Sequence, residues 1–315
     1  MRTLVTGGAG FIGCNLVRAL LARGDQVRIL DNLSTGQRAN VAGLDVELIE
    51  GDLRSYERVN AATKGVEVVF HQGALPSVPR SVQDPLTSNA VNVDGTLNVL
   101  LASRDRGVRR VVVASSSSVY GNAPGTPRTE QGPIAPLAPY AVSKLAAEQY
   151  SLVAHHTHGL ETVALRYFNV FGERQDPLSG YAAVIPKFTF MMLDGNRPTI
   201  FGNGSASRDF TYIENVVQAN LAAAVADGAS GRVFNVATGE TRTINLLVSE
   251  LNRLLGTDLE PEYLPPRPGE VSVSHADISA AAEVLGYRRL VTFEAGLERT
   301  VKWIAEHRSS GALSP

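Results

Sequence analysis

The chain has 315 residues, of which 44% are hydrophobic and 19% charged, as in a globular protein with a sizeable core. A formal net charge of -2 excludes the broad positive field of a nucleic-acid-binding protein. No apolar run approaches the ~20 residues that a membrane span needs. The single cysteine, Cys14, excludes an intrachain disulfide and favours a reducing compartment. Because the chain shows no signal-peptide pattern, we expect a cytoplasmic protein.

The first half of the chain alternates short apolar runs with helix-like periodic segments. The strands that we expect are Thr3–Thr6, Gln26–Asp31, Val46–Glu50, Glu67–His71, Arg110–Ser115 and Glu161–Tyr167. The helices that we expect include Phe11–Arg23, Leu86–Arg106 and Tyr140–His158. Strands rich in Val, Ile and Leu that alternate with helices are typical of a parallel sheet covered on both faces. The sequence therefore predicts an α/β fold with a doubly wound parallel (Rossmann) sheet, whose ligands bind at the carboxyl ends of the strands.

After Tyr167 the alternation fades, and proline and glycine become frequent over residues 177–204 and 261–269. Long loops of this kind in a compact protein usually carry function. Thr211–Val225 and Arg232–Val236 again have the patterns of a helix and a strand, which we expect to return to the main sheet. The remaining second half predicts a smaller C-terminal α/β substrate domain.

A glycine-rich segment directly follows the first predicted strand. Gly7, Gly10 and Gly13 have G-x-x-G-x-x-G spacing, a relative of the G-x-G-x-x-G dinucleotide fingerprint. Such glycines allow a tight turn and a close approach of the backbone to a pyrophosphate at a helix N-terminus. The second predicted strand ends at Asp31, whose carboxylate suits ribose hydroxyls and repels the 2′-phosphate of NADP. The sequence thus predicts NAD as the cofactor, with the adenine edge near Asp52 at the end of the third strand.

Two further segments contain candidate catalytic residues. Ser115–Ser118 ends the fifth predicted strand, and Tyr140 and Lys144 lie near the start of a predicted helix. Residues four apart on a helix share a face, with Cβ atoms about 5–6 Å apart. An ammonium beside a phenol favours the phenolate, so we expect a lowered pKa for Tyr140. With a serine hydroxyl to share the substrate proton, this set predicts general acid/base chemistry.

Together these segments resemble the extended short-chain dehydrogenase/reductases of the NAD-dependent epimerase/dehydratase family, over nearly the whole chain. The resemblance implies that Tyr140 is the acid/base, that Lys144 holds the cofactor ribose, and that Ser116 bonds the reacting hydroxyl. It also implies that Asn92 and Tyr167 support the cofactor site. The implied cofactor-binding residues are Gly7, Gly10, Phe11, Ile12, Gly13, Asp31, Asn32, Ser34, Gly36, Asp52, Leu53, Gln72, Gly73, Ala74, Asn92, Tyr140, Lys144 and Tyr167.

Later motifs resemble those of family members that act on nucleotide-linked sugars. Leu165–Gly172 resembles the start of the sugar pocket, with Asn169 on the diphosphate. Ser207–Phe210 and Arg267–Glu270 resemble two diphosphate and ribose anchors, for which a planar guanidinium is well suited. The implied substrate-binding residues are Ser77, Val78, Ser116, Ser117, Asn169, Ala183, Val184, Arg208, Arg267, Glu270 and Ser274, and no metal ligand is implied.

Ser117 and Ser118 bear on the type of reaction. The dehydratases of this family have Asp-Glu at these two places, because elimination of water needs an additional acid and base. Neither serine can deprotonate a carbon next to a ketone, so dehydration is disfavoured. Nucleotide-sugar decarboxylases and glucuronate 4-epimerases stay open, although the latter usually have Thr where this chain has Asn169.

The closest resemblance is to the bacterial UDP-N-acetylglucosamine 4-epimerases. It lies in Ser77–Ser81, Arg174–Pro177, Tyr181–Lys187 and Ser207–Ile213. A bulky aromatic commonly closes the acetamido position in UDP-glucose epimerases, and the matching residue here is the small Ser274. We therefore expect a UDP-sugar 4-epimerase that interconverts UDP-N-acetylglucosamine and UDP-N-acetylgalactosamine, and also UDP-glucose and UDP-galactose. The alternatives are a UDP-glucose or a UDP-glucuronate 4-epimerase.

We expect an NAD-binding domain of residues 1–168 and 211–238, and a nucleotide-sugar-binding domain of residues 169–210 and 239–315. The family resemblance also implies a homodimer in which the helices Leu86–Arg106 and Tyr140–His158 pair with their copies.

Two other classes of function have less support. A non-catalytic NAD-binding regulator on this fold would not need Tyr140 together with Lys144. A metal-dependent hydrolase could use the three histidines near the end of the predicted helix Tyr140–His158, but no carboxylate cluster accompanies them in the sequence.

Overall fold

A seven-stranded sheet organises the computed structural model, which describes residues 1–180, 182–266 and 272–309. Neighbouring strands are parallel, and their spatial order is β11-β6-β5-β4-β1-β2-β3. The strands are β1 (Arg2–Thr6), β2 (Gln26–Asp31), β3 (Val46–Glu50), β4 (Val68–His71), β5 (Arg110–Ser116), β6 (Glu161–Tyr167) and β11 (Arg232–Val236). The order reverses between β1 and β4, the place where doubly wound sheets bind ligands. The predicted fold class is confirmed.

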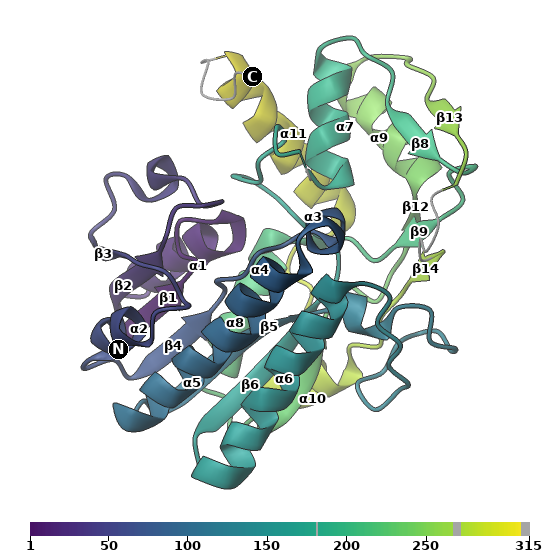
Figure 1. Cartoon of the computed structure of the whole chain (residues 1–315). Helices are drawn as coiled ribbons and strands as arrows, with labels where there is room; N and C mark the ends of the chain where they lie inside the picture. Colours follow the sequence, from purple (N-terminus) through teal and green to yellow (C-terminus); the bar gives the residue numbers. More distant parts are fainter. Residues whose placement is uncertain (181, 267–271, 310–315) are drawn as a thin grey trace.

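Helices cover both faces of this sheet (Figure 1). One face carries α1 (Phe11–Ala22) and α8 (Ile213–Ala223), and the other carries α2 (Tyr56–Thr63), α5 (Gly95–Asp105) and α6 (Pro139–His158). Successive residues of a strand point to opposite faces, so Val5 joins the core under α1 while Leu4 joins the core under α5. Burial on both faces explains the continuous apolar runs of the sequence.

The second half of the chain forms a smaller group of elements beyond the carboxyl ends of the main strands (Figure 1). It contains α7 (Val184–Leu193), α9 (Ile244–Leu255) and α11 (Phe293–Ser309) with the pairs β8 (Thr199–Phe201)–β13 (Glu262–Leu264) and β7 (Val170–Phe171)–β10 (Thr211–Tyr212). A three-stranded sheet joins β12 (Arg242–Thr243), β9 (Ser207–Arg208) and β14 (Val273–Ser274). The short elements η1 (Arg38–Val41), α3 (Val78–Gln83), η3 (Ser117–Tyr120) and α10 (Ser279–Leu285) complete the described fold. None of the described helices is long and apolar enough to cross a membrane.

Two predicted helices differ from the structure. The expected helix Leu86–Arg106 is divided into α4 (Pro85–Asn89), a π-helical turn η2 (Ala90–Asp94) and α5. Such turns insert one residue into a helix and are frequent at functional sites. The expected helix Thr211–Val225 begins only at Ile213, because its first two residues pair with β7 as the strand β10.

A buried ion pair joins α6 to the centre of the sheet. Arg166 on β6 donates from Nη2 to Glu148 Oε1 at 2.7 Å and from Nε to Oε2 at 2.8 Å. Ser115 on β5 donates to the same Oε2 at 2.7 Å, and Arg166 Nη1 donates to the Tyr120 hydroxyl oxygen at 2.8 Å. Glu148 and Arg166 are buried, so each charge depends on the other for compensation.

We expect Arg166→Leu or Glu148→Leu alone to lower the free energy of unfolding by about 3–5 kcal/mol, because each leaves one buried charge unpaired. The double variant should be more stable than either single variant, since it buries no charge. Urea unfolding monitored by circular dichroism measures all three. Single variants with wild-type unfolding midpoints would show that the pair does not hold α6.

Candidate active site

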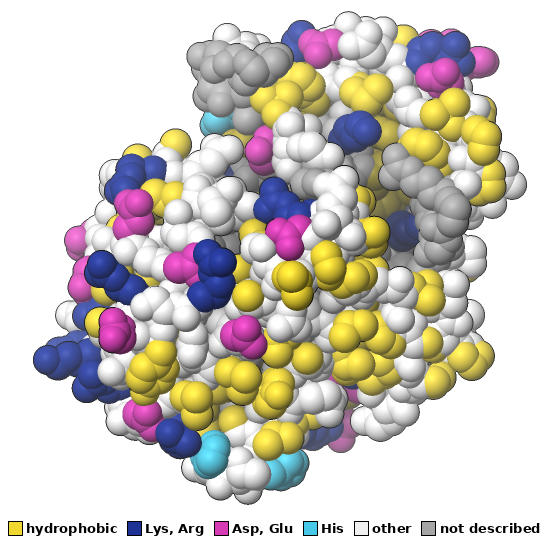
Figure 2. Space-filling view, in the orientation of Figure 1, with side chains coloured by type: hydrophobic (Ala, Val, Ile, Leu, Met, Phe, Trp, Pro, Cys, Tyr) yellow, Lys and Arg dark blue, Asp and Glu magenta, His cyan; other side chains and the backbone are white. Residues whose placement is uncertain are grey.

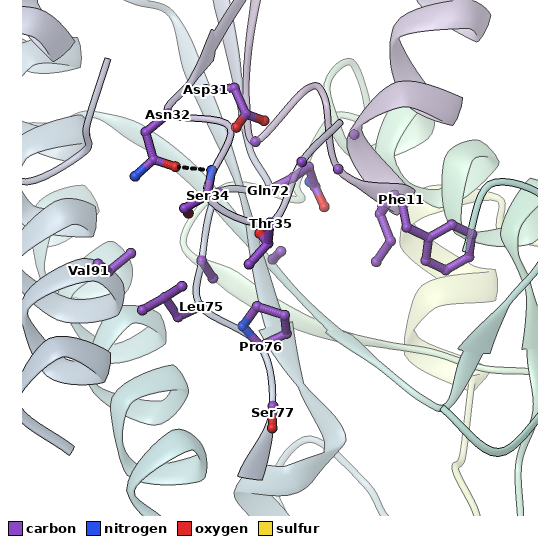
Figure 3. Close-up of a pocket in the computed structure, with 18 of the residues that line it drawn as sticks. Phe11, Asp31, Asn32, Ser34, Thr35, Gln72, Leu75, Pro76, Ser77 and Val91 are labelled. Atoms are coloured by element: carbon purple, nitrogen blue, oxygen red, sulfur yellow. Dashed lines mark hydrogen bonds between the residues drawn. The ribbon is translucent and has the colours of Figure 1, made fainter. Parts of the chain in front are cut away.

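A cavity of about 730 Å³ lies at the carboxyl ends of the central strands, where the strand order reverses (Figure 3). Its volume is in the range of small-molecule and cofactor sites. It is lined by every predicted cofactor-binding residue except Asn92, namely Gly7, Gly10, Phe11, Ile12, Gly13, Asp31, Asn32, Ser34, Gly36, Asp52, Leu53, Gln72, Gly73, Ala74, Tyr140, Lys144 and Tyr167. Residues from well-separated segments of the chain thus converge on one elongated site.

The glycine turn between β1 and α1 leaves no space for side chains. Gly7 has φ +67°, and a Cβ there would lie 2.7 Å from the backbone of Gly73. A Cβ on Gly13 would lie 2.1 Å from the carbonyl oxygen of Gly7. Gly10 caps α1 without a side chain, so the free amides of the first helical turn stand at the rim of the cavity. This cradle fits the diphosphate of a dinucleotide.

The adenosine end of the cavity is formed by carboxylates in fixed positions. Asp31 accepts hydrogen bonds from the amides of Ala9 at 2.9 Å and Leu33 at 2.8 Å. These bonds orient the carboxylate and leave lone pairs for ribose hydroxyls. Asp52 accepts from Arg54 and from Asn32 Nδ2, and the bonds from Arg54 hold the pKa of Asp52 well below its usual range. Both carboxylates would repel the additional phosphate of NADP.

One wall of the cavity rests on a directional chain of buried hydrogen bonds. Gly73 N donates to Thr6 Oγ1 at 3.1 Å, which lies 2.7 Å from His71 Nδ1. On the other side, His71 Nε2 lies 2.9 Å from Thr96 Oγ1, which donates to Asn92 O at 2.6 Å. Because the one proton of Thr96 goes to that carbonyl, His71 must donate from Nε2 and accept at Nδ1. Burial lowers the pKa of His71 to about 3, so the ring is neutral.

Asn92 itself lies behind this wall. Its Oδ1 accepts from Leu75 N at 2.7 Å, and its Nδ2 donates to Leu75 O at 3.2 Å and to Ser143 Oγ at 3.0 Å. Leu75 lines the cavity, and Ser143 donates to the carbonyl of Tyr140. Asn92 therefore supports the cofactor cavity through Leu75 and α6 and does not line it.

Tyr140 and Lys144 lie in the first two turns of α6, on the face toward the cavity. Pro139 starts the helix, and Ser81 Oγ accepts the Tyr140 amide at 3.0 Å. Ser116 bonds the Tyr140 side chain, and this hydrogen bond lowers the phenol pKa, but burial outweighs it and raises the pKa. Burial likewise lowers the pKa of Lys144 to about 8. The expected lowered pKa of Tyr140 is therefore wrong for the protein alone, because desolvation penalises both charged forms.

Ser116 is poised to donate its proton toward Tyr140. Its oxygen accepts from Ser118 N at 3.1 Å and from Ser118 Oγ at 2.9 Å. With these two donors in place, the hydroxyl proton of Ser116 points away from Ser118. Ser118 thus orients Ser116, which lies beside Tyr140.

A second cavity of about 510 Å³ adjoins the first, and Tyr140 lines both. The predicted substrate residues that line it are Val78, Ser116, Ser117, Asn169, Arg208 and Ser274, whereas Ser77 and Ala183 line the first cavity. Asn169 donates to Asp209 O at 3.1 Å and to Ser274 Oγ at 3.3 Å. Segments far apart in sequence, which carry Asn169, Arg208 and Ser274, therefore line this cavity together with Tyr140.

Three predicted substrate residues are not placed in either cavity. Val184 is the first residue of α7 and lines neither cavity. Arg267 and Glu270 lie outside the described residues. Within the described part of the chain, no group of three or more His, Cys, Asp or Glu residues could hold a metal ion.

Several lining residues were missed at the sequence level. Arg54 and Leu75 follow the ends of β3 and β4, where strand-end position was a usable signal. Arg128 lines the second cavity from a loop, and Arg174 lines the first from the loop after β7. Loop residues such as these have no periodic pattern that would identify them. For these two arginines the only sequence signal was the motif that contains Arg174.

Comparisons with known proteins agree with this geometry. Residues 3–237 match the model of the NAD dependent epimerase/dehydratase family. The chain belongs to this family. Membership confirms the predicted family and the NAD cofactor, whose cradle the glycine turn and Asp31 form.

Relatives in the family are similar over almost their full lengths. A putative UDP-glucose 4-epimerase of Methanocaldococcus jannaschii is 40% identical over 96% of this chain and 97% of the relative. A UDP-glucose 4-epimerase of Mycolicibacterium smegmatis is 40% identical over 96% of this chain and 98% of the relative. Among solved structures, a UDP-N-acetylglucosamine 4-epimerase from Methanobrevibacter ruminantium, in complex with UDP-N-acetylmuramic acid, superposes with a TM-score of 0.93 at 40% identity, covering 97% of this chain and 98% of that chain.

Proposed function

We propose that this protein is a UDP-sugar 4-epimerase that interconverts UDP-N-acetylglucosamine and UDP-N-acetylgalactosamine, and also UDP-glucose and UDP-galactose. The observation that carries the proposal is the position of Tyr140, which lines both the cofactor cavity and the second cavity and lies close enough to Ser116 for the serine to lower its pKa. The names of the relatives, which include UDP-glucose and UDP-N-acetylglucosamine 4-epimerases, support the same reaction.

The geometry suits proton transfer at a sugar hydroxyl. Tyr140 takes the proton of the 4-hydroxyl, and Ser116 bonds the same oxygen while charge develops there. NAD, when bound, supplies the acceptor and later the donor of the hydride at carbon 4. Arg208, at the other end of the second cavity, holds the diphosphate while the 4-keto sugar turns about its link to it. Tyr140 then returns the proton to the oxygen as carbon 4 regains the hydride on its opposite face, which gives the inverted alcohol.

The second cavity also argues against dehydration. Its described lining residues include serines, tyrosines, an asparagine and two arginines, but no carboxylate. Elimination of water requires an acid and a base beside the sugar, in addition to the phenol. Ser117 and Ser118, which begin η3 directly after β5, line this cavity at the places where the family resemblance puts that pair. Epimerisation needs only Tyr140 and its partners.

We expect Tyr140→Phe to lower kcat about 10²–10⁴-fold, because the ring is retained while the proton-transfer group is removed. Turnover of a panel of UDP-sugars, resolved by NMR, measures the effect. UDP binding and the unfolding midpoint serve as controls and should change little. Wild-type turnover by this variant would place the acid/base elsewhere.

Ser274 supports the choice of an N-acetylated substrate. It lies at the end of β14, pairs with β9 beside Arg208, and lines the second cavity with Ser117 and Tyr140. Its small side chain is held by the hydrogen bond from Asn169. A side chain of this size leaves space for an acetamido group. The bulky aromatic residue that is common at this place in UDP-glucose epimerases would close that space.

We expect Ser274→Tyr to lower kcat/KM for the N-acetylated pair about 5- to 150-fold, since overpacking costs about 1–3 kcal/mol. The non-acetylated pair should be spared, because it places only a hydroxyl there. The ratio of kcat/KM for the two pairs in wild type and variant is the measurement, with Ser274→Ala as the small control. An unchanged ratio would remove Ser274 as the selector.

A homodimer is part of the proposal. Apolar side chains gather on the face formed by α3, α4 and α6 (Figure 2). Those exposed there are Val82, Leu86, Val142, Tyr150 and Val153, with Leu86 82% exposed. An apolar surface shared by neighbouring helices is typical of an interface. Of these helices, α6 and most of α4 belong to the segments Leu86–Arg106 and Tyr140–His158 that pair with their copies in the family that the sequence resembles.

Light scattering at micromolar concentration should therefore show a dimer. We expect Val153→Glu to shift it toward monomer, because a carboxylate on α6 would be buried in the interface. Val225, which is 54% exposed against 50% for Val153, lies after α8 and provides the matched control Val225→Glu. A monomeric wild type would contradict this part of the proposal.

We also propose the division into two domains and the cytoplasmic location. The main sheet with its glycine turn supports an NAD-binding unit of residues 1–168 and 211–238, and the small sheets beyond it support the nucleotide-sugar unit. The single cysteine, buried in α1, is compatible with a reducing compartment.

A further inference from the structure

The loop between β7 and α7 covers part of the cofactor cavity. Its described residues that line the cavity are Arg174, Gln175, Asp176, Ser179, Ala182 and Ala183. The glycine turn lines the same cavity. The loop comes from the part of the chain proposed to bind the sugar, yet it faces the dinucleotide.

Asn15 on α1 fastens this loop to the first turn of the helix. Its Nδ2 donates to Glu173 O at 3.1 Å and to Phe11 O at 2.9 Å, and its Oδ1 accepts from Arg174 Nη1 at 3.2 Å. The Glu173 carboxylate accepts the Tyr212 hydroxyl at 2.6 Å, which holds the loop from its other side. Arg174 has φ +69°, a conformation that a non-glycine residue keeps only where the surroundings impose it. The hydrogen bond to Asn15 positions its guanidinium beside α1.

The charges around this point are unbalanced in the protein alone. Arg174 stands close enough to Arg18, also on α1, to lower the pKa of Arg18 together with burial. Arg18 Nη2 donates to Asn40 O, but its buried Nε has no hydrogen-bond partner among the described residues. Cys14, beside both, is no counter-ion, because burial raises its pKa to about 11. Two guanidiniums thus lie close together beside α1, Arg174 at the cavity and Arg18 in the third turn of the helix.

We propose that Arg174 is a cofactor-binding residue whose guanidinium bonds the NAD diphosphate from the side opposite the glycine turn. The segment 172–176, fastened by Asn15, then closes over the diphosphate as a strap and slows the release of NAD. Backbone amides of α1 and a planar guanidinium supply complementary donors to the two phosphates. An enzyme that restores its cofactor in each cycle gains from such retention.

The test is the rate at which the purified holoenzyme loses NAD. The protein is diluted into a resin that captures free nucleotide, and the NAD that remains bound is measured after denaturation. We expect Arg174→Gln, which removes the guanidinium and its charge but keeps a polar side chain, to lose NAD about 10- to 100-fold faster, as for one charge-assisted bond. Arg174→Lys should lose NAD at an intermediate rate, because lysine keeps the positive charge but lacks the two parallel donors of the guanidinium. Arg253→Gln, an exposed arginine on α9 paired with Glu250, should release NAD at the wild-type rate.

A second measurement separates phosphate binding from a general loosening of the loop. ADP-ribose and adenosine are titrated as competitors of NAD. Arg174→Gln should weaken ADP-ribose about as much as NAD and leave adenosine unchanged, and added salt should speed NAD loss more in wild type than in the variant. Unaltered NAD release, or equal weakening of ADP-ribose and adenosine, would overturn the proposal. These readouts involve no sugar, so they stand apart from the test of the epimerase reaction.

Discussion

The bidentate ion pair between Glu148 and Arg166 fixes the relation between α6 and the sheet, and the site depends on that relation. Tyr140 belongs to the helix and Ser116 to the end of β5, so the hydrogen bond between them requires the helix and strand to be held in one register. Ser115, next to Ser116, donates to the Glu148 carboxylate from the strand side. A buried ion pair is costly in free energy, but its directional bonds admit few arrangements. Here that arrangement aligns Tyr140 on the helix with Ser116 on the strand.

The second constraint is the contact of backbones at the point where the strand order reverses. Gly7, Gly13 and Gly73 meet closely enough that a Cβ on any of them would clash. The cofactor is thus placed by backbone atoms, whose positions follow from the sheet itself. The sugar cavity differs, because side chains from short strands and loops, Arg208 and Ser274 among them, make its wall. The cofactor half of the site thus follows from the main sheet. The residues of the sugar half can be substituted without changing that sheet.

The sequence was most informative where local patterns and tertiary structure agree. The bounds of β2, β3, β6 and β11 are as predicted, and the burial of β6 from Thr162 to Tyr167 matches the apolar character of that segment. The π-helical turn η2 was not predicted, because residues 86–106 have a helix-like pattern throughout. The residues around Tyr140 were identified, but the direction of its pKa shift was not, because burial is a property of the folded protein. A role for Arg174 could not be inferred from the sequence, because its contact with Asn15 exists only in the folded protein.

The histidine chain behind the cofactor wall has a consequence for the electrostatics of the site. Each member donates in one direction only, from Gly73 toward Asn92, so the chain has a single permitted arrangement of protons. With a pKa of about 3, His71 keeps its one proton on Nε2 throughout the neutral range. The wall therefore presents a constant dipole to the cofactor and adds no titrating charge. Among the residues that line the cavity, Lys144, whose pKa burial lowers to about 8, is a group whose charge changes close to neutral pH.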